Sequence, residues 1–114
     1  MMLEKISHVV LLKDFYGPLL TEKQQDVLSM HYENDWSLSE IASNINTSRQ
    51  AVYDMVKRAE SLLEEYERKL GLVEKFQRTR SSLDELTAFL EDSDVDKYKV
   101  SQAVALLKDI SRLL

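Results

Sequence analysis

The stretch from Ser37 to Arg58 constrains the fold of this chain more than any other segment, because it contains the sequence patterns of two helix N-termini. Ser37 and Glu40 form an S-x-x-E pair, and Thr47 and Gln50 form a T-x-x-Q pair. In such capping boxes the hydroxyl and the carboxylate or amide satisfy backbone groups that a helix start leaves without partners. The spacing therefore predicts two helices separated by a short turn.

The turn itself has suitable residues. We expect a first helix from about Leu38 to Ile45 and a second from Ser48 onward. Asn46 lies between them, and Asn readily adopts a positive φ, while Ala42 is small enough for close helix approach. This is the layout of a helix-turn-helix, with an ordinary pair of packed helices as the alternative. The apolar residues expected to close the two helices on each other are Leu38, Ile41, Ile45, Val52, Met55 and Val56.

A longer stretch is similar to region 4 of bacterial sigma factors. From Leu20 to about Glu65 the chain has a leading L-T helix, an acidic turn with an aromatic residue, then S-L-S-E-I-A and S-R-Q-A-V. With the N-terminal segment HVVLLKDFYGPLLTEKQ and the closing helix, it resembles the YlxM family over nearly its whole length. Those proteins are helix-turn-helix regulators of Gram-positive bacteria, linked to the signal recognition particle largely by gene neighbourhood. At Asn46 the chain departs from the glycine often found at this turn in sigma-like domains.

The resemblance implies a nucleic-acid-binding surface on the second helix. In helix-turn-helix proteins its first turn enters the major groove, where Arg binds guanine and Gln binds adenine. Arg49, Gln50 and Tyr53 would then contact bases or a partner, and Lys57 and Arg58 would contact phosphates. The same residues also suit the solvated face of an amphipathic helix, and Asp54 would repel phosphate. The candidate nucleic-acid-binding residues are Ser48, Arg49, Gln50, Tyr53, Lys57 and Arg58.

The net charge of −5 argues against strong, purely electrostatic binding of nucleic acid. Residues 37–58 carry +1, and residues 59–67 carry −4. Any affinity for DNA or for the RNA of the signal recognition particle therefore depends on a few cations or on dimerisation. The alternative is a protein-interaction module that uses the helix-turn-helix scaffold to bind a secretion component, such as the particle's GTPase, without nucleic acid.

The remainder of the chain predicts further helices and an all-α fold. Residues 1–16 have helical spacing, and we expect Gly17, in a left-handed turn, and Pro18 to end that helix. Thr21, with Gln24 three positions on, caps a helix to about residue 33. We favour a break near Gly71, with helices to about residue 69 and from 72 to 91, over one continuous helix. A last helix follows the acidic break at 92–96, with Ser93 or Asp94 as its cap.

This organisation predicts a helix-turn-helix domain over residues 1–70 and a C-terminal helical hairpin over residues 71–114. An apolar stripe runs along the first hairpin helix, and the last helix has an apolar face too wide to be left in water. The stripes offer a seam for packing or for a second copy. We therefore expect a homodimer, because a helix-turn-helix gains affinity by reading two half-sites.

Several other side chains have an ordinary interpretation beside a functional one. Trp36 suits a core anchor better than a base-stacking role. His8 and His31 lack metal-ligand spacing, and the acidic runs at 64–67 and 91–96 are expected to be solvated helix ends rather than cation sites. The basic cluster is either a second phosphate-facing patch or an ion-pair partner of the acidic runs; it consists of Lys75, Arg78 and Arg80.

Composition excludes several classes of protein. The chain has no cysteine, so neither a disulfide framework nor a thiolate metal site is available. The apolar run at residues 9–12 is far too short to span a bilayer. No glycine-rich phosphate loop, nucleophile elbow or acid pair indicates an enzyme. We expect a cytoplasmic protein without a cofactor.

Overall fold

The computed structural model describes residues 2–92 and 96–113, and over these residues the chain is all-α with no strand. The chain divides into two compact units, Met1–Val73 and Glu74–Leu114. None of the helices in the described ranges is both long enough and apolar enough to cross a membrane. The all-α fold expected from the sequence is confirmed.

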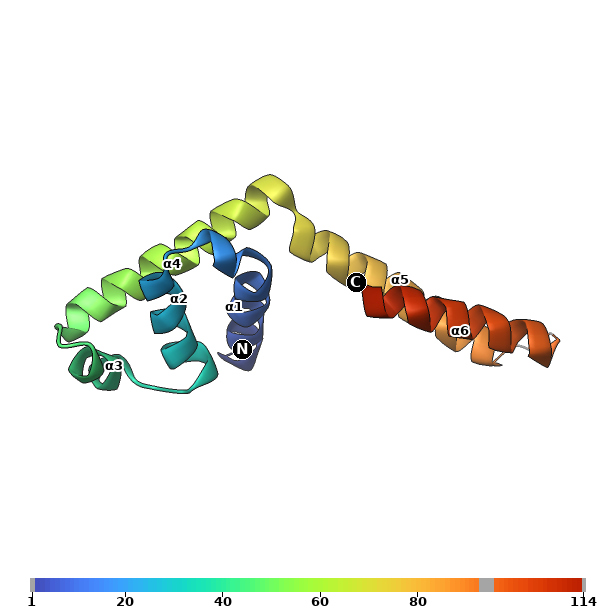
Figure 1. Ribbon diagram of the computed structural model, residues 1–114, viewed down its shortest axis with the longest axis horizontal. Helices are drawn as coiled ribbons and strands as arrows, with labels where there is room; N and C mark the ends of the chain where they lie inside the picture. Colours follow the sequence, from blue (N-terminus) through green and yellow to red (C-terminus); the bar gives the residue numbers. More distant parts are fainter. Residues whose placement is uncertain (1, 93–95, 114) are drawn as a thin grey trace. The chain divides into compact units, whose positions relative to one another are not determined.

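The N-terminal unit is organised around one long helix. Helices α1, α2 and α3 all pack against α4 and lie on the same side of it in Figure 1. A 3₁₀ turn, η1, follows α1, and a π-helical turn, η2, follows α2. The bounds are α1 Met2–Tyr16, η1 Gly17–Leu19, α2 Glu22–Leu28, η2 Ser29–Glu33, α3 Leu38–Asn44 and α4 Arg49–Leu70.

The core of this unit comes from the apolar faces that the sequence pattern indicates. Helices α1 and α4 present buried residues three and four apart to the centre, as expected of amphipathic helices, whereas α2 and α3 each bury an adjacent pair. Of the residues expected to close the helix-turn-helix, Ile41, Val52 and Val56 are buried, and the other three pack against them. The buried side chains are Val9, Leu12, Tyr16, Leu20, Val27, Leu28, Ile41, Ala42, Val52, Val56, Ala59, Leu63 and Val73.

Two of the three predicted capping boxes are confirmed. Thr21 and Ser37 each form a complete capping box, with Gln24 and Glu40 respectively. The prediction that Thr47 caps the next helix is wrong by one residue: Ser48 caps α4, and its Oγ accepts from the Ala51 N–H at 3.1 Å. The Thr47 N–H instead donates to the Ala42 carbonyl at 3.0 Å, so this residue belongs to the end of α3.

Three of the described residues have a positive φ, namely Asp35, Asn46 and Gly71. Asn46 has a φ of 56°, as expected, and follows the last turn of α3. Gly17 does not have a positive φ, so the expected left-handed turn after α1 is wrong; the chain continues instead into η1, with Pro18 in its first turn. Pro fits there because the start of a helix does not need its N–H.

The predicted break at Gly71 is present. Gly71 has a φ of 63° and lies in the left-handed region, and its N–H donates to the Glu67 carbonyl at 2.7 Å. Helix α5, Leu72–Asp92, begins directly afterwards. Gly is suited to this position because an L side chain makes the left-handed conformation unfavourable.

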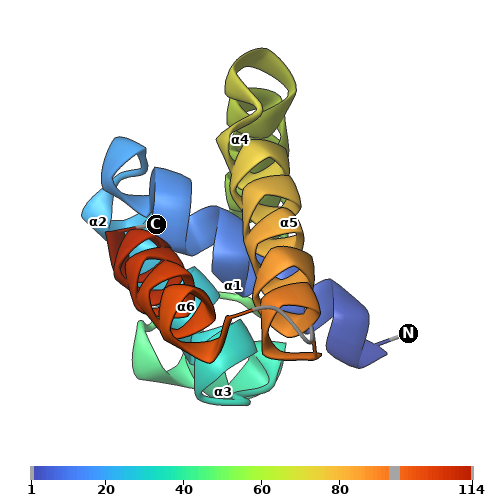
Figure 2. The same ribbon diagram turned by 90° about the vertical axis from the view of Figure 1, so that its right-hand side faces the viewer.

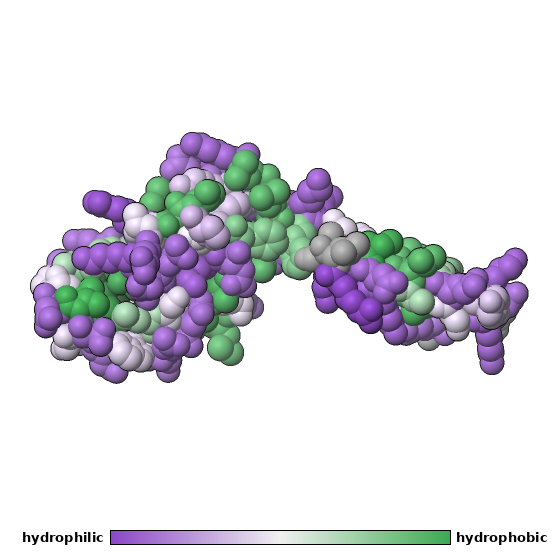
Figure 3. All heavy atoms as spheres, viewed as in Figure 1, coloured by the Kyte–Doolittle hydropathy of each residue, from purple (hydrophilic) through white to green (hydrophobic). Residues whose placement is uncertain are grey.

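The C-terminal unit is a hairpin of α5 and α6, Lys97–Leu113, which lie side by side in both views (Figures 1 and 2). Asp96 caps α6, since its Oδ1 accepts from the Tyr98 N–H at 3.0 Å. The caps predicted at Ser93 or Asp94 lie outside the described residues. Hydrophobic side chains gather along the upper edge of this hairpin in Figure 3.

Candidate nucleic-acid interface

The first turns of α4 have one buried side and one exposed side. Val52, Val56 and Ala59 face the core, which fixes the rotation of the helix about its own axis. The sequence-predicted site residues consequently lie on the solvent side, where Tyr53 is 42% exposed. The structure brings all six together at the start of one helix, and all six are exposed: Ser48, Arg49, Gln50, Tyr53, Lys57 and Arg58.

Two contacts order this exposed surface. Gln50 Nε2 donates to Asp54 Oδ1 at 3.0 Å, so the carboxylate that would repel phosphate is hydrogen-bonded to its neighbour one turn away. Lys57 Nζ lies 5.6 Å from the centre of the Tyr53 ring, within the range of a cation–π contact. Both pairs have the i, i+4 spacing of neighbours on a helix surface.

The cations of this surface differ in how they are engaged. Lys57 Nζ lies 3.5 Å from Glu60 Oε2, which is one turn further along α4. Arg49 and Arg58 form no ion pair with any residue in the described part of the chain. A guanidinium without a carboxylate partner keeps its donors available for a phosphate or a guanine edge.

The role of Ser48 is structural. Its backbone is extended, with φ −82° and ψ 155°, and its hydroxyl oxygen accepts the Ala51 N–H. This bond sets where α4 begins and therefore where Arg49 and Gln50 are displayed. The hydroxyl proton can still be donated to a phosphate oxygen.

A groove between the first turn of α2 and the exposed side of α4 adds one cation that the sequence pattern did not indicate. Lys23 is exposed and lines this groove together with Arg58. Because the two residues are 35 positions apart in the sequence, only the packing of α2 on α4 brings them to one groove. The full lining is Thr21, Lys23, Gln24, Ala51, Asp54, Met55 and Arg58.

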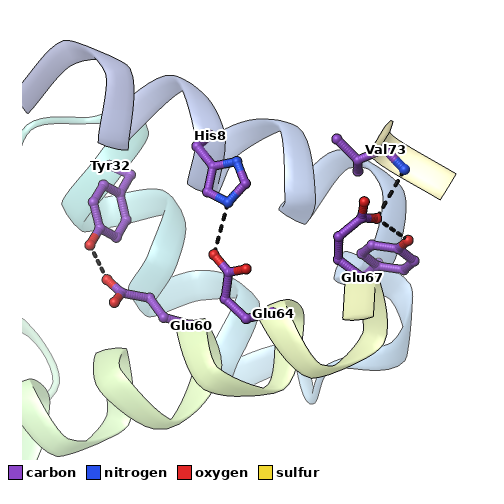
Figure 4. Close-up of polar contacts among 7 residues, drawn as sticks. His8, Tyr32, Glu60, Glu64, Glu67 and Val73 are labelled. Atoms are coloured by element: carbon purple, nitrogen blue, oxygen red, sulfur yellow. Dashed lines mark hydrogen bonds and ion pairs between the residues drawn. The ribbon is translucent and has the colours of Figure 1, made fainter. Parts of the chain in front are cut away.

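The acidic residues that follow the motif along α4 bind the N-terminal helices (Figure 4). Tyr32 donates to Glu60, and His8 Nε2 lies 2.8 Å from Glu64 Oε1. The Tyr16 hydroxyl donates to Glu67 Oε1 at 2.6 Å. The expectation of solvated helix ends is therefore wrong for Glu67, whose carboxylate is part-buried against α1, whereas the Glu64 side chain is 55% exposed and remains solvated beside His8.

Burial and hydrogen bonding change the acidity of two of these tyrosines. Removal from water, followed by the hydrogen bond to Glu67, raises the pKa of Tyr16 above its ordinary value of 10.0. Burial also raises the pKa of Tyr32, and the bond to Glu60 adds to the effect. Both hydroxyls are therefore donors at neutral pH, which is the form that a neighbouring carboxylate requires.

The remaining candidates have structural roles. Trp36 packs against the core, and His31 Nδ1 donates to its carbonyl oxygen at 2.9 Å, which joins the end of η2 to the start of the helix-turn-helix. No group of three or more possible metal ligands occurs among the described residues. Within the basic cluster, Arg78 lies 3.9 Å from Glu74, and Arg80 donates to the Ser111 carbonyl at 3.5 Å. Neither arginine pairs with the acidic runs in the described ranges.

Comparison with known proteins finds one matching family model and several similar proteins. The model of the family UPF0122, described as "Putative helix-turn-helix protein, YlxM / p13 like", matches residues 3–106. A UPF0122 protein of Geobacillus sp. (strain WCH70) is 43% identical over 113 residues, covering 98% of this chain and 99% of that protein. One from Halalkalibacterium halodurans is 45% identical over 113 residues, with the same coverage of both chains. A third, from Symbiobacterium thermophilum, is 42% identical over 106 residues, covering 93% and 97%.

Proposed function

The chain belongs to the UPF0122 family of YlxM- and p13-like helix-turn-helix proteins, and from this premise we propose that it is a nucleic-acid-binding regulatory protein of the signal recognition particle pathway. It acts in the cytoplasm as a binding protein and not as an enzyme. The ligand is duplex DNA or the RNA of the particle.

One observation carries this proposal. The start of α4 presents Arg49, Gln50 and Tyr53 to solvent on the side opposite the core, and the Arg49 guanidinium has no ion-pair partner in the described ranges. A helix-turn-helix uses this turn to reach base edges, with a bidentate Arg as its commonest specific contact. Lys57, Arg58 and Ser48 surround it with donors suited to phosphate oxygens.

The test is binding of the purified chain to fluorescently labelled duplex DNA and, separately, to the particle's RNA. Each titration is run at about 50 mM and about 200 mM salt, because phosphate contacts release counterions and make affinity fall steeply with salt. Salt-sensitive binding to one polymer supports the proposal and identifies that polymer. No binding to either at the lower salt contradicts it.

The reading face is tested by substitution. Arg49→Ala is expected to weaken binding by about 5- to 150-fold, the range for loss of one base-contacting arginine. The triple alanine variant at Arg49, Gln50 and Tyr53 is expected to lose more. Arg68→Ala is the matched control, because it removes an exposed cation from the far end of the same helix. If the triple variant and the control bind equally well, these residues are not the reading face.

A second candidate function follows from the charge of −5. In this alternative the helix-turn-helix is a scaffold that holds a protein of the secretion machinery, such as the particle's GTPase. Two results together would favour this alternative over the first proposal. The GTPase would bind the purified chain, and neither the DNA nor the RNA would bind it at low salt.

We further propose that the protein functions as a homodimer. A helix-turn-helix gains affinity when two copies reach half-sites about one DNA turn apart. Pairing also doubles the number of available cations on the nearly neutral reading segment, residues 37–58.

A further inference from the structure

We propose that two copies of this chain pair through one apolar face of the α5–α6 hairpin, with the two hairpins antiparallel. The inference rests on the homodimer proposed above and assigns its surface and orientation. It commits to a second copy of the chain as the occupant of that face.

The hairpin has too little core of its own. In the unit Glu74–Leu114, none of the described side chains is buried, whereas the unit Met1–Val73 has a continuous buried core. Phe89 is 69% exposed and Leu106 is 64% exposed. Helical stability in proteins comes largely from burying an apolar face, so two helices of this kind require a further partner.

Four of the exposed apolar side chains lie on one side of the two helices. Leu86 and Phe89 are three residues apart on α5, and Leu106 and Ile110 are four apart on α6, which places each pair on neighbouring turns. Figure 3 shows hydrophobic side chains over both helices along the upper edge of the hairpin. We call these four residues the apolar face. A different groove of the hairpin is partly charged, with Glu91, Lys97, Ser101 and Lys108 among its lining.

The size of this surface matches a pair of hairpins. With 21 residues in α5 and 17 in α6, the hairpin offers a side of roughly 30 Å by 20 Å, or about 600 Å², given the rise per residue and the diameter of a helix. Two such sides bury roughly 1,200 Å² in total, at the lower end of specific interfaces. The resulting four-helix arrangement is a common solution for helices with one apolar stripe.

Charge favours a second copy in the antiparallel orientation. Residues 84–99, the turn end, carry six acidic and two basic residues, for a net charge of −4. Residues 74–83 and 100–114, the open end, carry five basic and two acidic residues, for a net charge of +3. Antiparallel pairing places the turn end of each copy beside the open end of the other, whereas parallel pairing brings like charges together. The basic cluster of Lys75, Arg78 and Arg80 belongs to the open end.

The first test is the mass of the full chain in solution, without nucleic acid. At about 20 µM we expect twice the 13.3 kDa of one chain, and the double variant Phe89→Glu, Leu106→Glu is expected to associate about 100-fold or more weakly, because carboxylates would be buried without partners. Both residues are exposed in the single chain, so the substitutions remove no buried contact of the chain's own core, and circular dichroism records any helix that is lost together with the partner. Ser101→Glu is the control and should remain dimeric.

The second test uses the absence of cysteine from the natural chain. Under mild oxidation, Leu106→Cys is expected to cross-link two copies, since this residue lies near the centre of the apolar face. Lys75→Cys should not cross-link, because antiparallel pairing separates the two open ends. A wild-type chain that stays at 13.3 kDa overturns the homodimer itself. A dimer that survives the double glutamate variant overturns only this face, and efficient cross-linking through residue 75 overturns the antiparallel orientation.

Discussion

The Tyr16 hydroxyl donates to Glu67 Oε1 at 2.6 Å and accepts the Leu72 backbone N–H at 3.1 Å. The same Glu67 oxygen accepts the Val73 N–H at 3.0 Å. These two N–H groups are the first of α5, and a helix start provides no partner for them within the helix. Side chains of α1 and α4 therefore cap α5 directly after Gly71, in place of the local Ser, Thr or Asp that usually does so.

Removing the Tyr16 hydroxyl should destabilise the fold. Tyr16→Phe leaves both the Leu72 N–H and one side of the Glu67 carboxylate without this partner, and we expect a loss of about 1–3 kcal/mol in the free energy of unfolding. Urea denaturation followed by circular dichroism measures it. Tyr98→Phe is the matched control, since Tyr98 is 71% exposed, and should change stability by less than about 0.5 kcal/mol. Equal stability of the two variants would contradict the capping role.

Stability should fall in alkali through Tyr16 and Tyr32. Their pKa values are raised in the fold above 10.0, so the unfolded chain loses these protons first. Between the unfolded and folded pKa values the unfolded state binds fewer protons, and the free energy of unfolding decreases with pH. The contribution is complete below pH 10.0 and is lost as the pH rises above it. In the Tyr16→Phe, Tyr32→Phe double variant this decrease should be smaller than in wild type when thermal unfolding is recorded from neutral pH upward.

Gly71→Ala should be costly even though space is available for a methyl group. No atom lies within 4 Å of the position of an added Cβ, so any loss arises from the φ of 63°. An L residue in this conformation costs about 1–2 kcal/mol. Gly17→Ala serves as the comparison, because Gly17 lacks a positive φ and an added Cβ would meet Lys13 Cγ at 3.4 Å, an ordinary contact. Urea unfolding of both variants should show a loss for Gly71→Ala and little change for Gly17→Ala.

Asn46 should tolerate Gly but not a β-branched residue. Its φ of 56° is accessible to Asn and Gly, whereas Val is strongly disfavoured there. We expect Asn46→Gly to lie within about 0.5 kcal/mol of wild type and Asn46→Val to lose about 2 kcal/mol. Nucleic-acid binding by the Gly variant should be unchanged, since the turn keeps its conformation. A Val variant of wild-type stability would show that the turn adopts another backbone.

Lys23 should contribute to nucleic-acid affinity through a phosphate. If it makes one such contact, Lys23→Ala lowers the slope of log affinity against log salt by about 0.9 and weakens binding to all sequences alike. Salt titration of wild type and variant on two unrelated duplexes measures both effects. Lys5→Ala is the control, because Lys5 is an exposed lysine that lines a separate groove between α1 and α4. An unchanged slope would place Lys23 outside the interface.

Features set by neighbours in the sequence were predictable. The Thr21 and Ser37 capping boxes, the positive φ of Asn46 and the break at Gly71 each depend on a few adjacent residues. The cap of α4 was misplaced by one residue, since both Thr47 and Ser48 carry hydroxyls in suitable positions. Only the backbone bond from Thr47 to Ala42, which closes α3, distinguishes them.

Features that depend on packing between distant segments were not predictable. The sequence pattern of acidic residues after the motif would be the same whether their side chains faced water or α1. In the structure Glu64 is bonded to His8, and Glu67 to Tyr16. The groove shared by Lys23 and Arg58 likewise requires the position of α2 against α4. No local spacing rule contains this information, because it arises from how the apolar faces fit together.

The position of Glu60, Glu64 and Glu67 along α4 determines how strongly they repel a polyanion bound at the start of that helix. These acids lie 11 to 18 residues beyond Arg49 on one helix, or about 17–27 Å along its axis, which is at least twice the screening length of about 8 Å at physiological salt. Much of the negative charge of α4 is therefore remote from its first turn. A phosphate chain approaching Arg49 would respond mainly to the charges near the first turn of α4. The isoelectric point of the whole chain is therefore a poor guide to its affinity for nucleic acid.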